Sequence, residues 1–184
     1  MIELQRHTVD TAPEASRERL AQLEASRGSI GSMFGVLAES PAMLNGYLDL
    51  GAQLAANGAL TRADQTWVML TASREHGCRY CVPVYSRAAE RLGLDPATVR
   101  AIRNGEPIAD PRAAALSDLT ATLVRERGRV PDEAVHAFLE AGFSHAQLLE
   151  VLGGIALKTI TNYLTQFAAV PLDDDLAAFA WEAG

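Results

Sequence analysis

The chain has 184 residues, of which 48% are hydrophobic and 21% charged, and its formal net charge is −7. This mix is normal for a soluble globular protein, and the length allows one substantial core, so wholesale disorder is excluded. An acidic chain with no run of Lys or Arg is repelled by nucleic acid, so we expect no nucleic-acid partner.

The N-terminal residues and the longest apolar stretch indicate where in the cell the protein is located. Residues 1–16 lack the apolar core of a signal peptide. The apolar stretch 151–170 contains Lys158, Asn162 and Gln166 and recurs with helical period, which predicts a buried helix rather than a membrane span. We therefore expect a cytoplasmic protein without membrane contact.

Helix caps and stops punctuate the chain from end to end, and no long alternation of apolar and polar residues suggests a sheet. Ser40-Pro41 is typical of a helix start, and Gly28 and Gly142 are typical stops. We predict an all-α fold in one domain, 1–184, with a tail at 171–184 that docks through Leu172, Phe179 and Trp181. The expected helices, about eight, span 14–27, 41–57, 62–76, 78–92, 96–104, 111–127, 131–141 and 145–169, and a short apolar segment spans 29–39.

Four features outside the main motif also carry expectations. Gly153-Gly154 inside the last long helix costs roughly 1 kcal/mol per glycine against alanine, so we expect close packing there, within the domain or across a subunit interface. Lys158 either pairs with an acid across an interface or extends its amine outward to solvent, and we expect the second. Asp173 to Asp175 is expected to be a solvated turn, and Trp67 and Trp181 to anchor the packing.

The two cysteines, Cys78 and Cys81, form a C-x-x-C motif at a predicted helix start. At i and i+3 they share one helix face, so a disulfide between them is sterically possible. Unpaired N–H groups at a helix N-terminus stabilise a thiolate, and Arg74 and Arg79 add positive charge. In a reducing compartment this pattern indicates a redox-active pair rather than a structural disulfide.

Two other interpretations of the cysteines remain open. The first is half of a zinc site, which needs two more ligands at suitable spacing. The histidines past the N-terminal region, His76, His136 and His145, form no H-x(3–5)-H pair that would supply them. The second is a pair of inert buried thiols that simply pack as small hydrophobes. We expect neither a metal nor a cofactor.

The segment LTRADQTWVMLTASREHGCRYCVPVYSRAAERLG resembles the core of the carboxymuconolactone decarboxylase-like superfamily, on its alkylhydroperoxidase D side. The segments IRNGEPIADPRAAAL and GRVPDEAVHAFLEAGFSHAQLLEVLGGIALKTITNYLTQF resemble its uncharacterised peroxidase-related members. The likeness covers roughly 29–181, with the family-like core at about 29–170. It implies an all-α homo-oligomer (dimer, trimer or hexamer) that reduces hydroperoxides through the cysteine pair and is recycled by a thiol or dithiol reductant.

The resemblance also assigns roles within the motif. It implies that Cys81 is the peroxidatic and Cys78 the resolving cysteine, whereas helix-terminus electrostatics alone favours the first cysteine as the nucleophile. The family pattern has a histidine four residues after the second cysteine and often a glutamate twelve before the first. Here those positions hold Tyr85 and Thr66, and Thr165-Gln166 stands where related sequences often carry Asn-His.

Three residues are candidates to replace the altered proton relay. Tyr85, one turn after Cys81, can donate a hydrogen bond to a thiolate or peroxide oxygen. Glu75 and His76 come shortly before Cys78 and reach it if the loop bends back. Two alternative functions stay open: a lyase like the superfamily's namesake, acting on a small cyclic acid, and a non-catalytic oligomeric helical protein.

Overall fold

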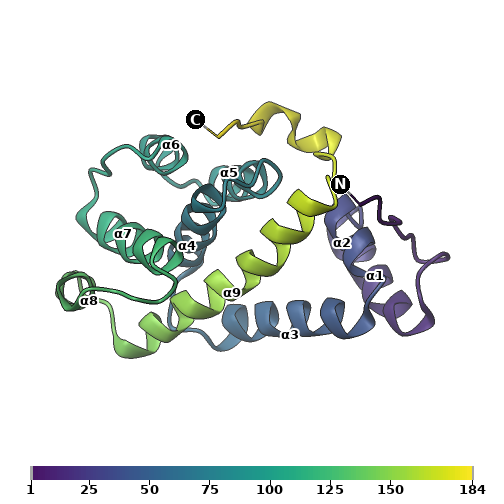
Figure 1. Cartoon of the computed structure of the whole chain (residues 1–184), viewed down its shortest axis with the longest axis horizontal. Helices are drawn as coiled ribbons and strands as arrows, with labels where there is room; N and C mark the ends of the chain where they lie inside the picture. Colours follow the sequence, from purple (N-terminus) through teal and green to yellow (C-terminus); the bar gives the residue numbers. More distant parts are fainter. Residues whose placement is uncertain (1, 184) are drawn as a thin grey trace.

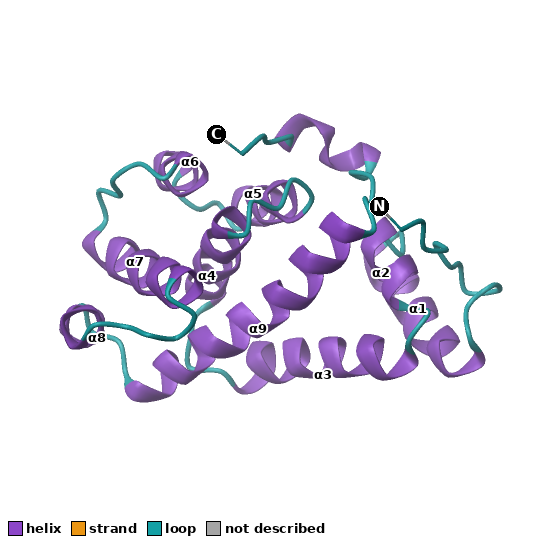
Figure 2. Ribbon diagram, in the orientation of Figure 1, coloured by secondary structure: helices purple, strands orange, loops and turns teal. Residues whose placement is uncertain are grey.

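The computed structural model describes residues 2–183, and across them the fold is built from helices and loops without strands (Figure 2). Eight α-helices of seven residues or more match the predicted number, and α2 (Ser32–Leu37) and a 3₁₀ turn, η1 (Asp174–Phe179), are shorter. The all-α prediction is confirmed. The longer helices are α1 (Glu14–Arg27), α3 (Pro41–Asn57), α4 (Arg62–Glu75), α5 (Cys81–Arg91), α6 (Pro96–Asn104), α7 (Pro111–Arg125), α8 (Asp132–Glu140) and α9 (His145–Phe167).

Local caps fix most helix starts where the sequence predicts them. Ser40 accepts the N–H of Met43 with Pro41 in the first helical position, and Thr61 and Asp64 cap α4 reciprocally. These bonds satisfy N–H groups that have no partner within the helix. The starts of α3 and α4 are therefore set by residues adjacent in sequence, independent of the rest of the fold.

Helix α9 is the central element of the arrangement. It crosses the middle of the molecule, with α3 along one side and α4 to α7 on the other, while α1 and α2 pack at the end where α9 finishes (Figure 1). Buried side chains form two clusters. One joins α1, α2, α3 and both cysteines, and the other joins α4 to α9 around Leu70, Leu116 and Phe138.

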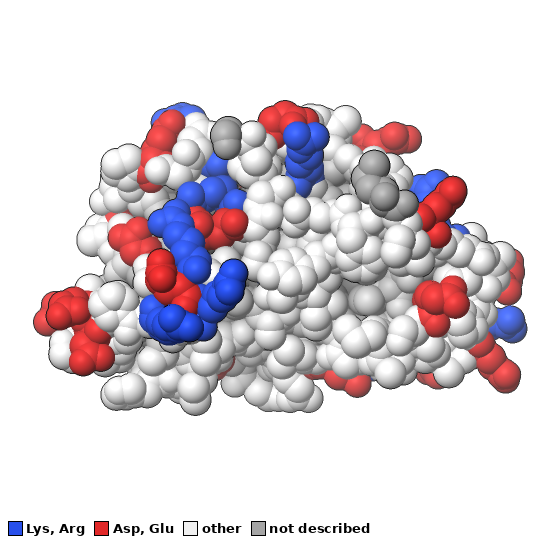
Figure 3. Space-filling model, in the orientation of Figure 1, with Lys and Arg blue, Asp and Glu red and all other residues white. Residues whose placement is uncertain are grey.

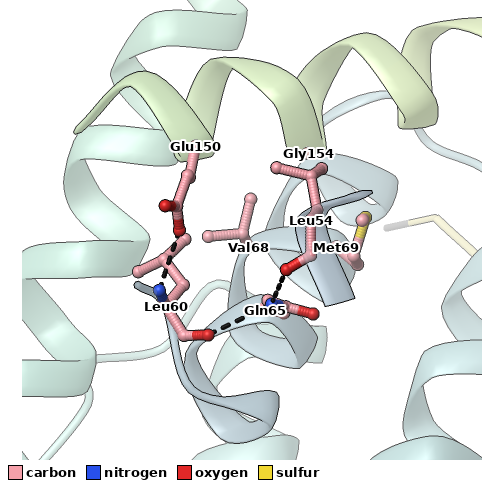
Figure 4. A pocket seen from close by; sticks show the side chains of 7 residues that line it. All are labelled: Leu54, Leu60, Gln65, Val68, Met69, Glu150 and Gly154. Carbon is pink, nitrogen blue, oxygen red and sulfur yellow. Dashed lines mark hydrogen bonds between the residues drawn. The ribbon is translucent and has the colours of Figure 1, made fainter. Parts of the chain in front are cut away.

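The turn between α3 and α4 is tied to α9 by one carboxylate. Glu150 accepts the N–H groups of Ala59 and Leu60 at 2.7 and 2.8 Å, and Gln65 donates to the carbonyls of Leu54 and Leu60 (Figure 4). Because N–H donors paired with a carboxylate make strong hydrogen bonds, this joint fixes the start of α4 relative to α9. Helix α4 ends at the cysteine turn, so the joint also positions the candidate site.

The chain beyond α9 returns across α5 as a strap, residues 170–183 (Figure 1). Leu176 is 1% exposed and is the strap's best-buried side chain, whereas Leu172, Phe179 and Trp181 are partly buried. Trp181 also donates from its indole N–H to the carbonyl of Arg103 at 3.1 Å. The side chain that packs the strap most deeply is therefore Leu176, which the sequence did not single out.

No helix among the described residues is long and apolar enough to cross a membrane. Charged side chains lie toward both ends of the face shown in Figure 3, over α7 and α8 and along the edge near α1, while its middle is largely uncharged.

Candidate functional site

The cysteine motif lies in the turn between α4 and α5. Gly77 takes a positive φ of 63°, which reverses the chain after α4, and the N–H of Cys78 donates to the carbonyl of Ser73. Helix α5 begins at Cys81, so Cys78 precedes it instead of lying within its first turn as predicted. The sulfur of Cys78 accepts the N–H of Cys81 at 3.2 Å and thus occupies the N-terminus of the helix.

Cys78 is sealed and stabilised as a thiolate. Its side chain is 0% exposed, and the hydroxyl of Thr165 lies 3.2 Å from its sulfur. A hydrogen bond from the thiol of Cys81 is the main cause that lowers the pKa of Cys78 to about 6, against the opposing effect of burial. Such a pKa leaves Cys78 largely ionised at neutral pH.

Cys81 is the partner that keeps its proton. The hydrogen bond that its thiol donates to Cys78 is the main reason why the pKa of Cys81 lies well above its usual value, and burial is the second. Its sulfur lies 3.8 Å from the hydroxyl of Thr161 and 3.9 Å from the amine of Lys158. The two sulfurs therefore share one proton and one negative charge, which rests on Cys78.

Lys158 lies inside the site, contrary to the prediction that it extends to solvent. It is 2% exposed, and its Nζ lies 4.4 Å from the centre of the Tyr85 ring. Burial disfavours the charged form of Lys158, whereas negative charge on the sulfur of Cys81 or on the neighbouring phenols raises its pKa. The side chain is held inward because α9 faces Cys81 at this position.

A groove of about 930 Å³ opens onto this cluster. Cys81, Lys158 and Tyr85 line it, whereas Cys78 does not. Tyr47 from α3 also lines it, and burial raises the pKa of that phenol, which therefore remains protonated. A ligand that enters the groove meets the Cys81 side of the dithiol.

The three predicted relay candidates separate in space. Tyr85 lies at the site beneath Lys158, and Thr66 also lines the groove, although its hydroxyl donates to the carbonyl of Arg62. Glu75 is paired with Arg74 at 2.7 Å and with Arg125 at 2.8 Å, and its described polar contacts include neither sulfur.

His76 packs its ring edge-on against Tyr163, and burial lowers the pKa of its imidazole. Its Nε2 has no hydrogen-bond partner among the described residues. The backbone carbonyl of His76 accepts from Gln166, so the neighbouring Thr165 and Gln166 support the cysteine turn from α9. Of the three candidates, Tyr85 alone lines the groove beside Cys81.

Sequence reasoning missed Lys158, Thr161 and Tyr47. A signal for the first two was present: Lys158, Thr161 and Thr165 are polar residues at spacings of three and four in an otherwise apolar helix, which places them on one face. Tyr47 carried no such signal, because only tertiary packing brings α3 beside the site.

The strap also contributes to the motif's surroundings. The carboxylate of Asp173 accepts from the hydroxyl of Tyr80 at 2.6 Å and from the N–H of Ser32 at 3.1 Å. Asp173 is therefore bonded to Tyr80, one of the two residues between the cysteines, and the prediction of a solvated turn is wrong at this position. Asp175 pairs with Arg87 of α5.

Within residues 2–183, no three His, Cys, Asp or Glu side chains come together as a metal site. Both cysteines are free thiols. The fold and site thus define an all-α protein with a buried dithiol at the end of a groove.

The sequence profile of the Carboxymuconolactone decarboxylase family matches residues 41–122, from the start of α3 to near the end of α7. This match agrees with the resemblance seen in the sequence and places it in that segment of the chain. No protein in the curated set is significantly similar to the chain in sequence.

Solved structures confirm the alkylhydroperoxidase D-like fold. An alkylhydroperoxidase D core, the uncharacterised peroxidase-related protein from Ralstonia eutropha, has a TM-score of 0.83 at 18% identity over 96% of each chain. A peroxidase-related protein from a Silicibacter species has a TM-score of 0.78 at 16% identity, covering 96% of this chain and 97% of the other. A debrominase in its apo form has a TM-score of 0.76 at 16% identity, covering 96% and 93%.

Proposed function

We propose that the protein is a dithiol oxidoreductase that reduces hydroperoxides, with Cys81 as the attacking and Cys78 as the resolving thiol. One observation carries the proposal: Cys81 lines the groove, whereas Cys78, whose thiolate is stabilised, is fully buried and does not line it. The fold shared with peroxidase-related proteins supports the reaction class.

The first step moves a proton within the pair. Cys78 holds the charge at rest, so it takes the proton of Cys81 and leaves a Cys81 thiolate 3.9 Å from the ammonium of Lys158. That thiolate attacks the distal oxygen of the hydroperoxide and breaks the O–O bond. Cys81 becomes a sulfenic acid, and the departing alkoxide takes a proton from Lys158 or Tyr85 to leave as an alcohol.

The second step closes the disulfide. Cys78 gives its proton to the hydroxyl of the sulfenic acid and attacks the sulfur of Cys81, and water leaves. Lys158 or Tyr85 regains its proton from solvent, so the sum is one thiol, one thiolate, one proton and one hydroperoxide giving one disulfide, one alcohol and one water. An external thiol or dithiol then reduces the disulfide, which suits the reducing cytoplasm in which free thiols persist.

The test follows free thiols against added hydroperoxide in the wild type, Cys81→Ser and Cys78→Ser. Wild type should lose two thiols per peroxide consumed, Cys81→Ser should consume almost none, and Cys78→Ser should stop at a sulfenic acid that dimedone traps. A wild type that keeps both thiols through many equivalents of peroxide rules the proposal out.

A second candidate is reductive debromination with the same dithiol. A variant of the debrominase, solved with 2,3,4-tribromopyrrole, has a TM-score of 0.79 at 13% identity. Aromatic rings of Tyr47, Tyr80 and Tyr85 line the groove beside Cys81, which favours a flat aromatic ligand. The two thiols would supply two electrons and two protons: one proton goes to carbon as C–Br becomes C–H, the other is released with bromide, and the disulfide forms. Bromide release from 2,3,4-tribromopyrrole, absent in Cys81→Ser, is the measurement.

We also propose that the protein is a homo-oligomer. Four large side chains of α9, at positions 149, 152, 163 and 167, are 44–66% exposed and share one helix face. The middle of this surface over α9 carries little charge (Figure 3). A second copy of the chain would bury that apolar stripe, and light scattering of wild type and Tyr163→Glu tests it, since the variant should dissociate.

A further inference from the structure

Lys158 is a buried cation without a carboxylate. No ion pair involves it among the described residues. Its polar neighbours are the Cys81 sulfur and the phenols of Tyr85 and Tyr47. An isolated ammonium out of water is costly, and proteins normally pair or neutralise such a group. The resting negative charge of the dithiol lies on Cys78, whereas the sulfur next to Lys158 is that of Cys81.

The groove in front of Lys158 is also electropositive, although the chain as a whole carries −7. Six basic side chains line it against two carboxylates, Asp173 and Asp175. Arg62 and Arg91 are among the six and form no ion pair within the described residues. A groove lined by one sign of charge raises the local concentration of the opposite ion.

The walls beside Lys158 are aromatic and apolar. The ring of Tyr85 lies against the ammonium, and Tyr47, Met69 and Leu157 line the same groove. Tyr47 keeps its proton, so it donates a hydrogen bond but does not neutralise the lysine. A ligand that satisfies both features has one anionic group and an apolar or aromatic body.

We propose that this groove binds an organic carboxylate, with the carboxylate at Lys158 and its apolar body between Tyr47 and Tyr85, within reach of Cys81. The inference rests on the proposed function in one respect: it assigns a negatively charged group to the hydroperoxide that Cys81 attacks. Binding of the carboxylate itself does not depend on thiol chemistry, so the two ideas fail separately.

The experiment titrates benzoate and benzamide, which share shape and differ in charge, into the Cys78→Ser/Cys81→Ser protein by calorimetry. Benzoate should bind at least about 10-fold more tightly than benzamide, the ratio expected for one charge-assisted contact. Lys158→Met should abolish this preference. Replacing a buried charge by an apolar residue of similar length is often neutral or stabilising, so the variant should fold, which its Tm checks.

Arg91→Gln is the matched control, because it removes a positive charge from the groove and leaves Lys158, the cation beside Cys81, in place. It should change benzoate affinity by less than about 3-fold, as exposed charges usually do. Equal affinity for the two probes, no binding of either at millimolar concentration, or a preference that survives in Lys158→Met overturns the inference. If benzoate preference holds while the wild type ignores peroxide, the proposed function fails and the carboxylate site stands.

Discussion

The hydroxyl of Thr165 lies 3.2 Å from the sulfur of Cys78, across 87 positions of sequence. It helps lower the pKa of that thiol, after the larger contribution of the Cys81 thiol. Thr165 stands where related sequences often carry a polar Asn, so a residue that departs from the family pattern still serves the cysteine pair. The long helix α9 thus positions the thiolate that α4 and α5 present.

Thr165→Val tests that contact with a near-isosteric change. Valine lacks the hydroxyl, so the Cys78 thiolate loses one stabilising neighbour and its pKa rises. A hydrogen bond of roughly 0.5–1.5 kcal/mol corresponds to a fall of about 3- to 10-fold in the ionisation constant. Ultraviolet absorbance of the thiolate against pH measures it. Thr165→Ser keeps the hydroxyl and should titrate like wild type; identical titration of the valine variant would contradict the assignment.

The lowered pKa of Cys78 predicts a pH dependence of stability for the reduced protein. The thiol has a pKa of about 6 when folded and 9.0 as its ordinary value, so between these values the unfolded chain binds the extra proton. Stability contributed by Cys78 is therefore present in full above pH 9 and lost as pH falls through 6. Cys81 acts oppositely, but its raised folded pKa places its loss above pH 9.

The measurement is the free energy of unfolding of wild type minus that of Cys78→Ser, both reduced, at several pH values from 6 to 9. The difference should grow with pH by at most roughly 1.4 kcal/mol per unit, the limit for one proton. A difference that is flat over this window shows that Cys78 is not a stabilised thiolate.

The parts of the fold that the sequence predicted are those decided by neighbours in the chain. Thr61 and Asp64 cap α4, and Ser40 with Pro41 begins α3, through contacts within a few residues. Composition and helical period then suffice for an all-α fold, because they require no knowledge of which helices meet.

The parts that the sequence did not predict depend on which helices meet. A lysine in an apolar helix ordinarily extends its amine to solvent. Only the packing of α9 against the cysteine turn shows that the amine of Lys158 is buried beside Cys81. Three consecutive aspartates likewise suggest a solvated turn. Asp173 is instead bonded to Tyr80, because the strap returns across α5. The C-x-x-C pair itself was found from sequence alone, since its spacing is local.

Tyr80→Phe tests the strap's bond to the cysteine motif. The Tyr80 hydroxyl is buried and donates to a carboxylate at 2.6 Å, and such hydrogen bonds contribute about 1.5–3 kcal/mol. We expect the variant to lose stability by that amount in urea unfolding and to show faster hydrogen exchange in 170–183. Asp173→Asn, which keeps an acceptor, should lose less. An unchanged hydrogen-exchange rate in residues 170–183 would show that the Tyr80 hydroxyl does not hold the strap in place.

Gly153 and Gly154 give the last prediction, because the two adjacent glycines should respond differently to alanine. A Cβ at Gly154 would lie 2.7 Å from Cγ1 of Val68, a stiff β-branched side chain, in the cleft shown in Figure 4. A Cβ at Gly153 would meet the flexible end of Leu54 at 3.2 Å. The close packing expected for this pair thus occurs within the chain, of α9 against α3 and α4.

Alanine gains roughly 1 kcal/mol in a helix relative to glycine, and overpacking typically costs about 1–3 kcal/mol. Gly153→Ala should therefore be close to neutral, while Gly154→Ala should be destabilised by up to about 2 kcal/mol in urea unfolding. Gly154→Ala combined with Val68→Ala relieves the clash, so the double variant should be more stable than the sum of the two single changes. Strict additivity would mean that Val68 is not what excludes a side chain at Gly154.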